Sequence, residues 1–509
     1  MTKALAPLPT EDSAQHFETV IIGTGFSGLL AAIRLQKKGF NDFILLERSQ
    51  ELGGTWQINS YPGAEVDIPT GLYSISFVPF PFKKSFAPQS ELLAYTNHII
   101  NTFGLRKKAK TNCSVTSLSY DESRCLWTVE TGSGDTFTAR FVIDSSGVLA
   151  NPHTPHIKGA ERFEGAQFHA GHWDHSVDYE GKRVAVIGSG CSGAQIVPAM
   201  ADKVSRLTLF MGKAQWILPR SDRNYSAIES YLRTLPGIRH IIRLLFFIFY
   251  DLRFVAFRRY PLISRLAPYM KAYYRRRLQK HLDRYIRDEK LRAHMMPDYE
   301  LGSRRVIPSN NYLPALAREN VDVDISGIDC ITPTGIRTKE GKDIDLDIIV
   351  YATGYYAYSD MKRALTFQVN GIGGRNLNSE WETAAISSYK GITMAGYPNY
   401  FKVNGPNTGS GHSSQLSYMQ VATDYIVQAI SAVKADASIK AIEPKQELQD
   451  AYVAGMRAKM EKTVWQKATT TAFYRKNMSE EVTSLSPEPV TGFIFSRKWF
   501  RLSDYHLIK

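Results

Sequence analysis

The chain has 509 residues, which is too long for one ordinary hydrophobic core, so we expect two or three domains. Its 43% of apolar and 22% of charged residues are typical of a globular protein and exclude a disordered or fibrous chain. The net charge of +13 arises largely between residues 220 and 305, which contain 20 lysines and arginines against 8 aspartates and glutamates. Such a surplus indicates either an anionic partner, meaning a phosphate-bearing cofactor or a membrane surface, or a solvated helical face. No nucleic-acid-binding motif accompanies it, so no nucleic-acid partner is expected.

The cysteine pattern bounds the redox chemistry. Cys113, Cys125, Cys191 and Cys330 occur without a C-x-x-C motif or a close pair. This pattern favours a reducing compartment and argues against a disulfide framework, a zinc site or a dithiol reductase. The first twenty residues contain no long apolar run, so we expect no secretory signal. We therefore predict a cytoplasmic protein with no bound metal.

A first strand–turn–helix unit lies near the start of the chain. An apolar strand over residues 20–22 leads into Gly23-x-Gly25-x-x-Gly28 and a helical pattern, and a second strand ends at Glu47. The first glycine allows the tight turn, the second lets a pyrophosphate approach the backbone, and the third lets the helix pack on the strand. The helix N-terminus offers free N–H groups to phosphates, and Glu47 is expected to bind ribose hydroxyls. The pattern predicts a dinucleotide site; the alternative is a glycine-rich loop without a ligand.

A second unit of the same kind follows in the sequence RVAVIGSGCSGAQIV. Gly188, Gly190 and Gly193 repeat the glycine spacing, and the next strand, RLTLF, runs into Met-Gly-Lys213. No carboxylate stands at the end of this strand to bind a ribose 2′-hydroxyl, and a lysine lies close by. This favours NADP(H) over NAD(H), unless Lys213 is merely a surface residue.

Each unit has a late strand that ends in glycine, FVIDSSG at Gly147 and DIDLDIIVYATG at Gly354. Two such units indicate two bound dinucleotides, FAD in the first and a nicotinamide cofactor in the second. We therefore predict an α/β fold with two Rossmann-like dinucleotide-binding domains, one for FAD and one for NADP.

Residues 221–300 read as helices rich in Arg, Tyr and Phe. The apolar run over residues 244–250 is far too short to cross a bilayer. We expect a helical insertion that covers the active-site cleft, and the alternative is weak peripheral membrane contact. A further helix is expected over residues 414–433.

The segment FEGAQFHAGHWD, residues 163–174, carries Phe163, Gly165, His169 and Trp173 at regular offsets. It resembles the signature F-x-G-x-x-x-H-x-x-x-W of class I flavoprotein Baeyer–Villiger monooxygenases. Related heteroatom-oxidising flavin monooxygenases usually lack the tryptophan. The resemblance implies that the segment links the FAD and NADP domains and acts as a hinge, with the histidine supporting cofactor rearrangement. A linker whose histidine and tryptophan simply pack is the alternative.

Three other segments resemble the same family over most of the chain. In ELGGTWQINSYPGAEVD, the resemblance places Trp56 near the flavin and Asp67 near its reactive edge. In GSRRVIP, Arg305 takes the place of the essential arginine and Arg304 that of a lysine. The late Gly-Pro-Asn run contains Asn407. A permanently charged guanidinium can stabilise an anionic oxygen nucleophile, and a carboxylate beside it can hold it in place.

Further residues complete the expected cofactor contacts. On the FAD side they are Ser27, Thr55, Tyr73 and Val115, and on the NADP side they are Ser189 and Ser192. The sequence departs from the family at Met211-Gly212-Lys213-Ala214, where Gln-Arg-Ser/Thr-Pro is usual. The arginine that normally reads the 2′-phosphate is thus absent, so Lys213 and Arg304 must replace it.

The domain boundaries follow from these segments. We predict the FAD domain at 1–150 and 365–509, including a C-terminal pocket and control-loop region, the NADP domain at 151–220 and 301–364, and the helical insertion at 221–300.

The resemblance implies an FAD-containing, NADPH-dependent enzyme that converts a ketone and O2 to an ester or lactone through a C4a-peroxyflavin, with Arg305 and Asp67 as catalytic residues. One alternative is S- or N-oxygenation by the same cofactors. An alternative of another class is an NADPH-binding flavoprotein that does not oxygenate.

Overall fold

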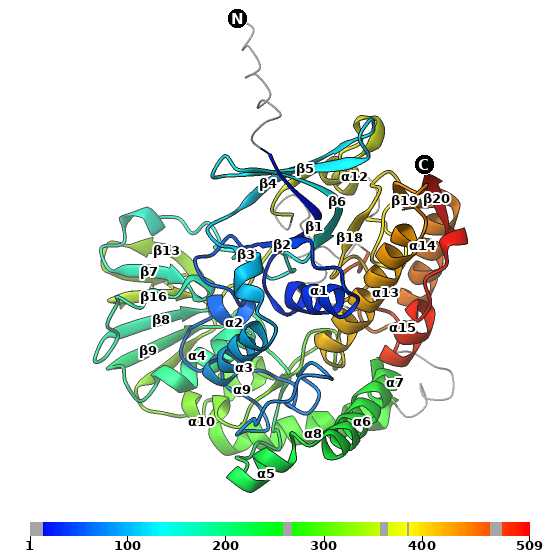
Figure 1. Ribbon diagram of the computed structural model, residues 1–509. Helices are drawn as coiled ribbons and strands as arrows, with labels where there is room; N and C mark the ends of the chain where they lie inside the picture. Colours follow the sequence, from blue (N-terminus) through cyan, green and yellow to red (C-terminus); the bar gives the residue numbers. More distant parts are fainter. Residues whose placement is uncertain (1–13, 258–266, 357–364, 384–385, 469–480) are drawn as a thin grey trace, which may run out of the picture.

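The computed structural model describes residues 14–257, 267–356, 365–383, 386–468 and 481–509 (Figure 1). Two β-sheets organise the molecule. One sheet is built from both ends of the chain, and the other from its middle.

The larger sheet has eight strands in the order β17-β4-β5-β6-β1-β2-β3, with β18 also pairing with β6. Strands β1, β2, β3, β6 and β18 run parallel, whereas β4, β5 and β6 form an antiparallel meander. Residues 20–22 of β1 are buried on both faces, because Ile21 packs in the core of α1 and α13, and Val20 and Ile22 pack in the core that includes β4 and β5. The strands are β1 (Gln15–Ile22), β2 (Phe43–Leu46), β3 (Ala109–Lys110), β4 (Val115–Asp121), β5 (Leu126–Thr131), β6 (Thr136–Asp144), β17 (Gln368–Asn370) and β18 (Tyr400–Lys402).

A C-terminal helix covers this N-terminal sheet. Helix α1 (Phe26–Lys37) packs against α13 (Gln415–Ala435), and buried side chains of both helices belong to one hydrophobic core (Figure 1). The two ends of the chain therefore fold as one domain. Its other elements are α2 (Thr55–Ile58), α3 (Gln89–Thr102), α12 (Leu377–Thr383), α14 (Gln446–Met460), α15 (Val490–Arg497), and the pair β19 (Ala441–Pro444) and β20 (Tyr505–Ile508).

The second sheet has five parallel strands in the order β12-β9-β8-β16-β7. Helix α4 (Cys191–Met200) and α10 (Tyr312–Leu316) share its hydrophobic core. An antiparallel meander of β13 (Ile328–Thr332), β14 (Gly335–Thr338) and β15 (Asp343–Asp345) lies beside it. The sheet strands are β7 (Ala166–His169), β8 (Arg183–Ile187), β9 (Arg206–Phe210), β12 (Val321–Asp324) and β16 (Ile348–Tyr351), and β10 (Ile217–Leu218) pairs separately with β11 (Ile307–Pro308).

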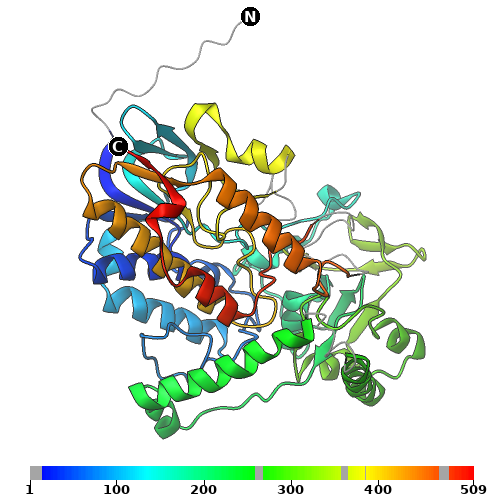
Figure 2. The same cartoon turned by 90° about the vertical axis from the view of Figure 1, so that its right-hand side faces the viewer.

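Helices between residues 221 and 300 lie across both domains. Ile242 and Phe246 of α6 pack beside Gly71 of the first domain, whereas Leu278 and Leu282 of α8 enter the core of the second. Figure 2 shows α6 as a long helix that runs beside α15. The helices are α5 (Ala227–Leu232), α6 (Pro236–Leu252), α7 (Phe254–Phe257), α8 (Ala267–Tyr285) and α9 (Glu289–His294).

The predicted α/β fold of two dinucleotide-binding units is confirmed. One difference lies in the second return strand, which was expected as a single strand, DIDLDIIVYATG, ending at Gly354. It divides into β15 and β16, which belong to different sheets. The break falls where Leu346 turns inward to the core that β13 and β14 share with the main sheet.

Candidate active site

The first glycine turn has the close contacts that the motif predicts. Gly23 has a φ of +94°, and a Cβ there would lie 2.7 Å from the Ser145 carbonyl oxygen. A Cβ on Gly28 would lie 1.9 Å from the carbonyl oxygen of Gly23, so only glycine lets α1 approach the turn. Gly25 caps α1, and a Cβ there would meet only the Gly54 Cα, at 3.7 Å. The turn thus leaves room at the helix N-terminus for a pyrophosphate.

Glu47 lies beside this turn. Its buried carboxylate follows β2 and accepts hydrogen bonds from the Thr24 amide at 3.0 Å, the Thr24 hydroxyl at 2.6 Å and the Ser49 amide at 3.0 Å. Ser27 is buried on α1 and donates to the Ser145 carbonyl at 3.3 Å, and Val115 begins β4. The fold therefore brings Glu47 and the glycines together, in the arrangement that a ribose and pyrophosphate require.

The second glycine turn repeats this geometry. Gly188 has a φ of +115°, and a Cβ on Gly193 would lie 2.0 Å from the Gly188 carbonyl oxygen. Gly190 caps α4, and a Cβ built there would have no heavy atom within 4 Å. Ser192 stands in the first turn of α4 and is half-buried. The two turns thus fit two dinucleotides on one chain.

Lys213 and Arg304 lie at the edge of this second turn. Lys213 is exposed three residues after β9, and its carbonyl oxygen accepts a hydrogen bond from the Ser189 hydroxyl at 3.1 Å. The Arg304 guanidinium lies over the Tyr299 ring, 5.7 Å from its centroid. The Tyr299 hydroxyl donates to the Ala214 carbonyl at 2.8 Å, which joins the two segments. The Lys213 backbone thus contacts the predicted NADP turn, and Arg304 is connected to the neighbouring Ala214 through Tyr299.

Asp67 and Arg305 form a bidentate ion pair. The Arg305 Nε lies 2.5 Å from Asp67 Oδ2, and Nη2 lies 2.7 Å from Oδ1. Burial raises the pKa of Asp67. The positive charge of Arg305, with a smaller contribution from Arg220, lowers it by more than burial raises it, so the pKa falls below its ordinary value. The side chains are 24% and 34% exposed, so the pair is held by protein on one side and reachable on the other.

This ion pair lies where the two domains meet. The turn before Asp67 packs on α4, because a Cβ on Gly63 would lie 2.4 Å from the Gln195 carbonyl oxygen. The Tyr61 hydroxyl donates to Gln195 Oε1 at 2.9 Å. Burial raises the pKa of Tyr73, and the charge of Asp67 raises it further, which places Asp67 near that ring.

Trp56 completes this part of the site. Its indole N–H donates to the Tyr73 hydroxyl at 3.1 Å, and the two rings meet edge to face. Thr55 stands beside it as the first residue of α2. Two aromatic rings and an ion pair are thus gathered from residues 55–73 and Arg305.

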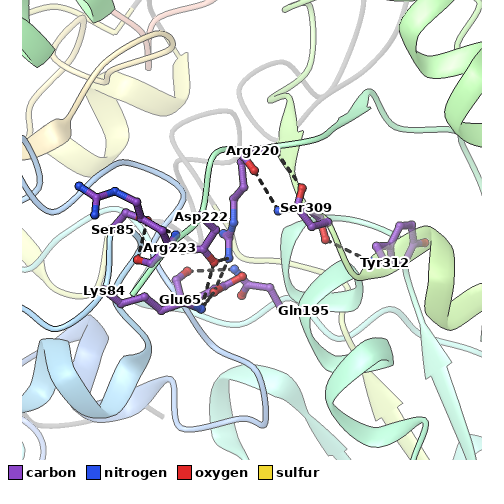
Figure 3. A network of polar contacts seen from close by, with 10 residues as sticks. Glu65, Lys84, Ser85, Gln195, Arg220, Asp222, Arg223, Ser309 and Tyr312 are labelled. Carbon is purple, nitrogen blue, oxygen red and sulfur yellow. Dashed lines mark hydrogen bonds and ion pairs between the residues drawn. The ribbon is translucent and has the colours of Figure 1, made fainter. Parts of the chain in front are cut away.

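A second polar network, which no sequence motif predicts, holds Glu65, two residues before Asp67 (Figure 3). The Arg220 side chain is 8% exposed, and its Nη2 lies 2.7 Å from Glu65 Oε2 and 2.9 Å from Asp222 Oδ2. Lys84 Nζ lies 3.0 Å from Asp222 Oδ2, and the Gln195 side-chain amide donates to the Glu65 carbonyl at 2.9 Å. Arg220 and Glu65 are 155 residues apart, so no local spacing could have revealed them.

Part of the predicted linker forms a strand. Residues 166–169 become β7, which pairs in parallel with β16 at the edge of the second sheet. Phe163 is buried in the core beneath it, and a Cβ on Gly165 would lie 2.4 Å from the Asp347 carbonyl oxygen. Trp173 packs edge to face on Phe168, with ring centroids 4.9 Å apart. All these signature residues have a packing role.

His169 ends β7 as a buried, neutral imidazole. Its Nδ1 accepts a hydrogen bond from the Gly171 amide at 2.9 Å, and burial lowers its pKa to about 4. The ring lies edge to face with Tyr355, whose hydroxyl donates to the Asn59 side chain of the first domain. His169 is therefore one contact away from the boundary between the domains.

Asn407 makes different contacts. Its φ is +57°, its amide N–H donates to the Thr483 carbonyl at 2.6 Å, and its side chain donates to the Leu485 carbonyl at 3.2 Å. These bonds tie the loop after β18 to the C-terminal segment.

Comparison with known proteins agrees with this geometry. The sequence profile of the pyridine nucleotide-disulphide oxidoreductase family matches residues 20–240. Baeyer–Villiger monooxygenases of Streptomyces coelicolor and Pseudomonas aeruginosa are each 34% identical, over 98% and 99% of this chain and 94% of each relative. A closed structure of cyclohexanone monooxygenase aligns with a TM-score of 0.86 at 22% identity, over 97% of this chain and all of that one. An oxidised steroid monooxygenase bound to NADP aligns with a TM-score of 0.82 at 25% identity, with the same coverage.

Two glycine turns on two sheets, with a charged site at their junction, define an oxidoreductase with paired dinucleotide-binding domains. Within that class, the full-length similarity shows that the chain belongs to the Baeyer–Villiger monooxygenase family.

Proposed function

We propose that this chain is an FAD-containing, NADPH-dependent Baeyer–Villiger monooxygenase that converts a ketone and O2 to an ester or lactone. The observation that carries the proposal is the Asp67–Arg305 ion pair, which lies at the junction of the two domains. Full-length relatives named Baeyer–Villiger monooxygenase support it.

FAD is assigned to the first glycine turn and NADPH to the second. Glu47 beside the first turn suits an unphosphorylated ribose, and Lys213 with Arg304 beside the second suits a 2′-phosphate. The assigned FAD domain, 1–150 and 365–509, and NADP domain, 151–220 and 301–364, agree with the membership of the two sheets. The remaining predicted site residues, including Asn407, are also proposed to contact the cofactors. The four free cysteines support a cytoplasmic location.

The chemistry that FAD supplies when bound is the reduction of O2 with electrons from NADPH and the transfer of one oxygen atom to the ketone. Arg305 stays positively charged and stabilises the negative charge that develops on oxygen when the carbonyl is attacked. Asp67 holds two nitrogens of that guanidinium and so fixes its orientation. Arg220 and Glu65 anchor the segment that carries Asp67.

His169 serves as a positioning residue in this proposal. With a pKa near 4 it is neutral at pH 7, so it carries no proton to deliver from Nδ1. Its contacts with Gly171 and Tyr355 instead shape the segment that joins the domains.

Substitution of Arg305 tests the proposal. We expect Arg305→Ala to retain FAD and to be reduced by NADPH, while ester formation falls at least about a hundredfold, a loss of about 3 kcal/mol of transition-state stabilisation. Flavin absorbance follows reduction, and mass spectrometry measures products from a ketone and a thioether.

Arg337→Ala is the matched control, because Arg337 forms an equally bidentate but exposed pair with Asp343 at 2.8 Å. It should leave ester formation unchanged. Near wild-type ester formation by Arg305→Ala would contradict the role of this residue, and sulfoxide as the only product would favour heteroatom oxidation.

A further inference from the structure

Helix α6 presents an unusual outer surface. Six large apolar side chains on it are 45–65% exposed, and we call them the α6 face: Ile241, Leu244, Leu245, Ile248, Phe249 and Leu252. Most globular proteins leave single apolar residues exposed, whereas a contiguous patch marks an interaction surface.

The fold does not account for this face. The opposite side of α6 already packs on the first domain, where Ile242 and Phe246 lie against Gly71 and the Arg243 guanidinium donates to the Ser74 carbonyl at 2.8 Å. Phe247 packs with the core of α13 and α15. The helix is therefore anchored on one side and apolar on the other.

Helices next to α6 also carry exposed large apolar side chains. Ile228 and Tyr231 of α5 are 74% and 64% exposed, and Phe495 of α15 and Trp499 just beyond it are 75% and 65% exposed. Figure 2 shows α6 and α15 side by side, and the Val490 amide at the start of α15 donates to Asp251 of α6.

Basic residues border this face, and the acidic residue of α6, Asp251, is bound by the Val490 amide. Residues 236–250 contain two arginines, a histidine and no acidic residue. Lys498 and Arg501 are exposed beside Trp499, and Lys498 Nζ lies 5.0 Å from the centroid of the Trp499 ring. An apolar helical face with Trp and Phe, bordered by basic side chains, is typical of helices that lie in a membrane interface.

We propose that the α6 face docks onto the surface of an anionic lipid bilayer. Helix α6 has 17 residues, and in the described part of the chain no helix is long and apolar enough to cross a membrane, so the protein would lie on the bilayer. A second copy is a poorer occupant, because pairing two such faces would bring basic side chains of both copies together. The proposal stands independently of the reaction.

Vesicle flotation of the FAD-loaded full-length protein tests the docking. Vesicles of equal parts phosphatidylcholine and phosphatidylglycerol should carry wild-type protein, and pure phosphatidylcholine or high salt should carry less. The double variant Leu245→Gln/Ile248→Gln should bind at least about tenfold more weakly, because two aliphatic side chains no longer enter the interface. Leu507→Gln is the matched control, since Leu507 is 41% exposed on β20, far from α6 (Figure 2).

Trp499 gives a second, position-specific measurement on the unaltered protein. All seven tryptophans lie in the described ranges, and six of them are at most 9% exposed, so Trp499 is the only exposed one. Brominated phosphatidylglycerol vesicles should quench wild-type tryptophan fluorescence, and Trp499→Phe should lose most of that quenching.

Three outcomes would overturn the proposal. In the first, the wild-type protein does not float with anionic vesicles. In the second, it floats, but the double α6 variant floats equally well and brominated lipid does not quench tryptophan fluorescence. In the third, the wild-type protein is a dimer that does not float, and the α6 substitutions dissociate it. The last result would assign this face to contact between copies.

Discussion

The ionisation of Asp67 depends on two cations that reach it from different parts of the chain. Burial alone would raise its pKa, but Arg305 and Arg220 lower it below 3.8. The carboxylate therefore stays charged at neutral pH and keeps Arg305 oriented. Arg305 itself needs no such tuning, because a guanidinium remains protonated throughout the physiological range.

Cofactor preference is expected to depend on Lys213. Lys213→Ala should raise the Michaelis constant for NADPH roughly ten- to a hundredfold, because it removes a charge-assisted contact to the 2′-phosphate, and should change the constant for NADH little. Steady-state kinetics with both cofactors measure the difference. Lys182 precedes strand β8, at the end away from the glycine turn, so Lys182→Ala should change neither constant. Equal effects of Lys213→Ala on both cofactors would remove Lys213 from the phosphate site.

The buried His169 predicts a pH dependence of stability. Its folded pKa of about 4 lies below the ordinary value of 6.5, so the unfolded chain binds the proton first as the pH falls. The stabilisation is present above pH 6.5 and is lost as the pH falls toward 4. We expect His169→Gln to show a shallower loss of unfolding free energy over this interval in urea titrations. His506→Gln, on exposed β20, should keep the wild-type slope, and identical slopes for all three proteins would contradict the burial of His169.

At the scale of elements, each glycine turn fixes how closely a helix approaches its sheet. In both turns the third glycine touches the carbonyl oxygen of the first, whereas the second faces open space or another glycine. Packing and ligand binding are thus assigned to different glycines of one motif.

This division predicts that two neighbouring substitutions affect different properties, one the stability and the other NADP+ binding. Gly193→Ala should lower the unfolding free energy by about 1–3 kcal/mol, because its Cβ would lie 2.0 Å from the Gly188 carbonyl oxygen. Gly190→Ala has open space and a φ of −72°, so it should keep the stability of the wild type but bind NADP+ more weakly. Thermal unfolding and titration calorimetry separate the two effects. Full NADP+ affinity in Gly190→Ala would mean that the dinucleotide does not approach this turn.

At the scale of the whole molecule, polar contacts between the two domains fix their relative position. Arg220 binds Glu65 and Asp222, and Gln195 on α4 binds the Glu65 carbonyl (Figure 3). Tyr355 donates a hydrogen bond to Asn59. Such polar contacts are usual for an interface between domains of one chain.

Arg220→Met should therefore weaken the junction more than an ordinary surface substitution. It removes the cation that bridges the largely buried Glu65 and Asp222, so we expect a loss of about 3 kcal/mol in unfolding free energy. Calorimetry should show the two domains unfolding in more separate steps. Arg206→Met, which breaks an exposed pair with Asp322, should cost less than about 1 kcal/mol. Equal costs for the two variants would contradict the supporting role of Arg220.

The sequence by itself determined the elements whose chemistry is local. Glycine spacing, a strand and a following helix are enough to specify each dinucleotide turn, and the structure confirms the resulting α/β fold. The linker signature, with Trp173, identified the family, which the full-length relatives confirm.

Only the tertiary structure decided what depends on contacts between distant segments. It brought Arg305 to Asp67 across 238 residues, paired Arg220 with Glu65, and formed β7 from part of the linker. Helix α6 is apolar on both sides, so its sequence could not reveal which side packs; the fold places Phe246 against Gly71 and exposes Leu245. Burial, and with it the pKa values of buried groups such as His169, arises from packing that no local pattern encodes.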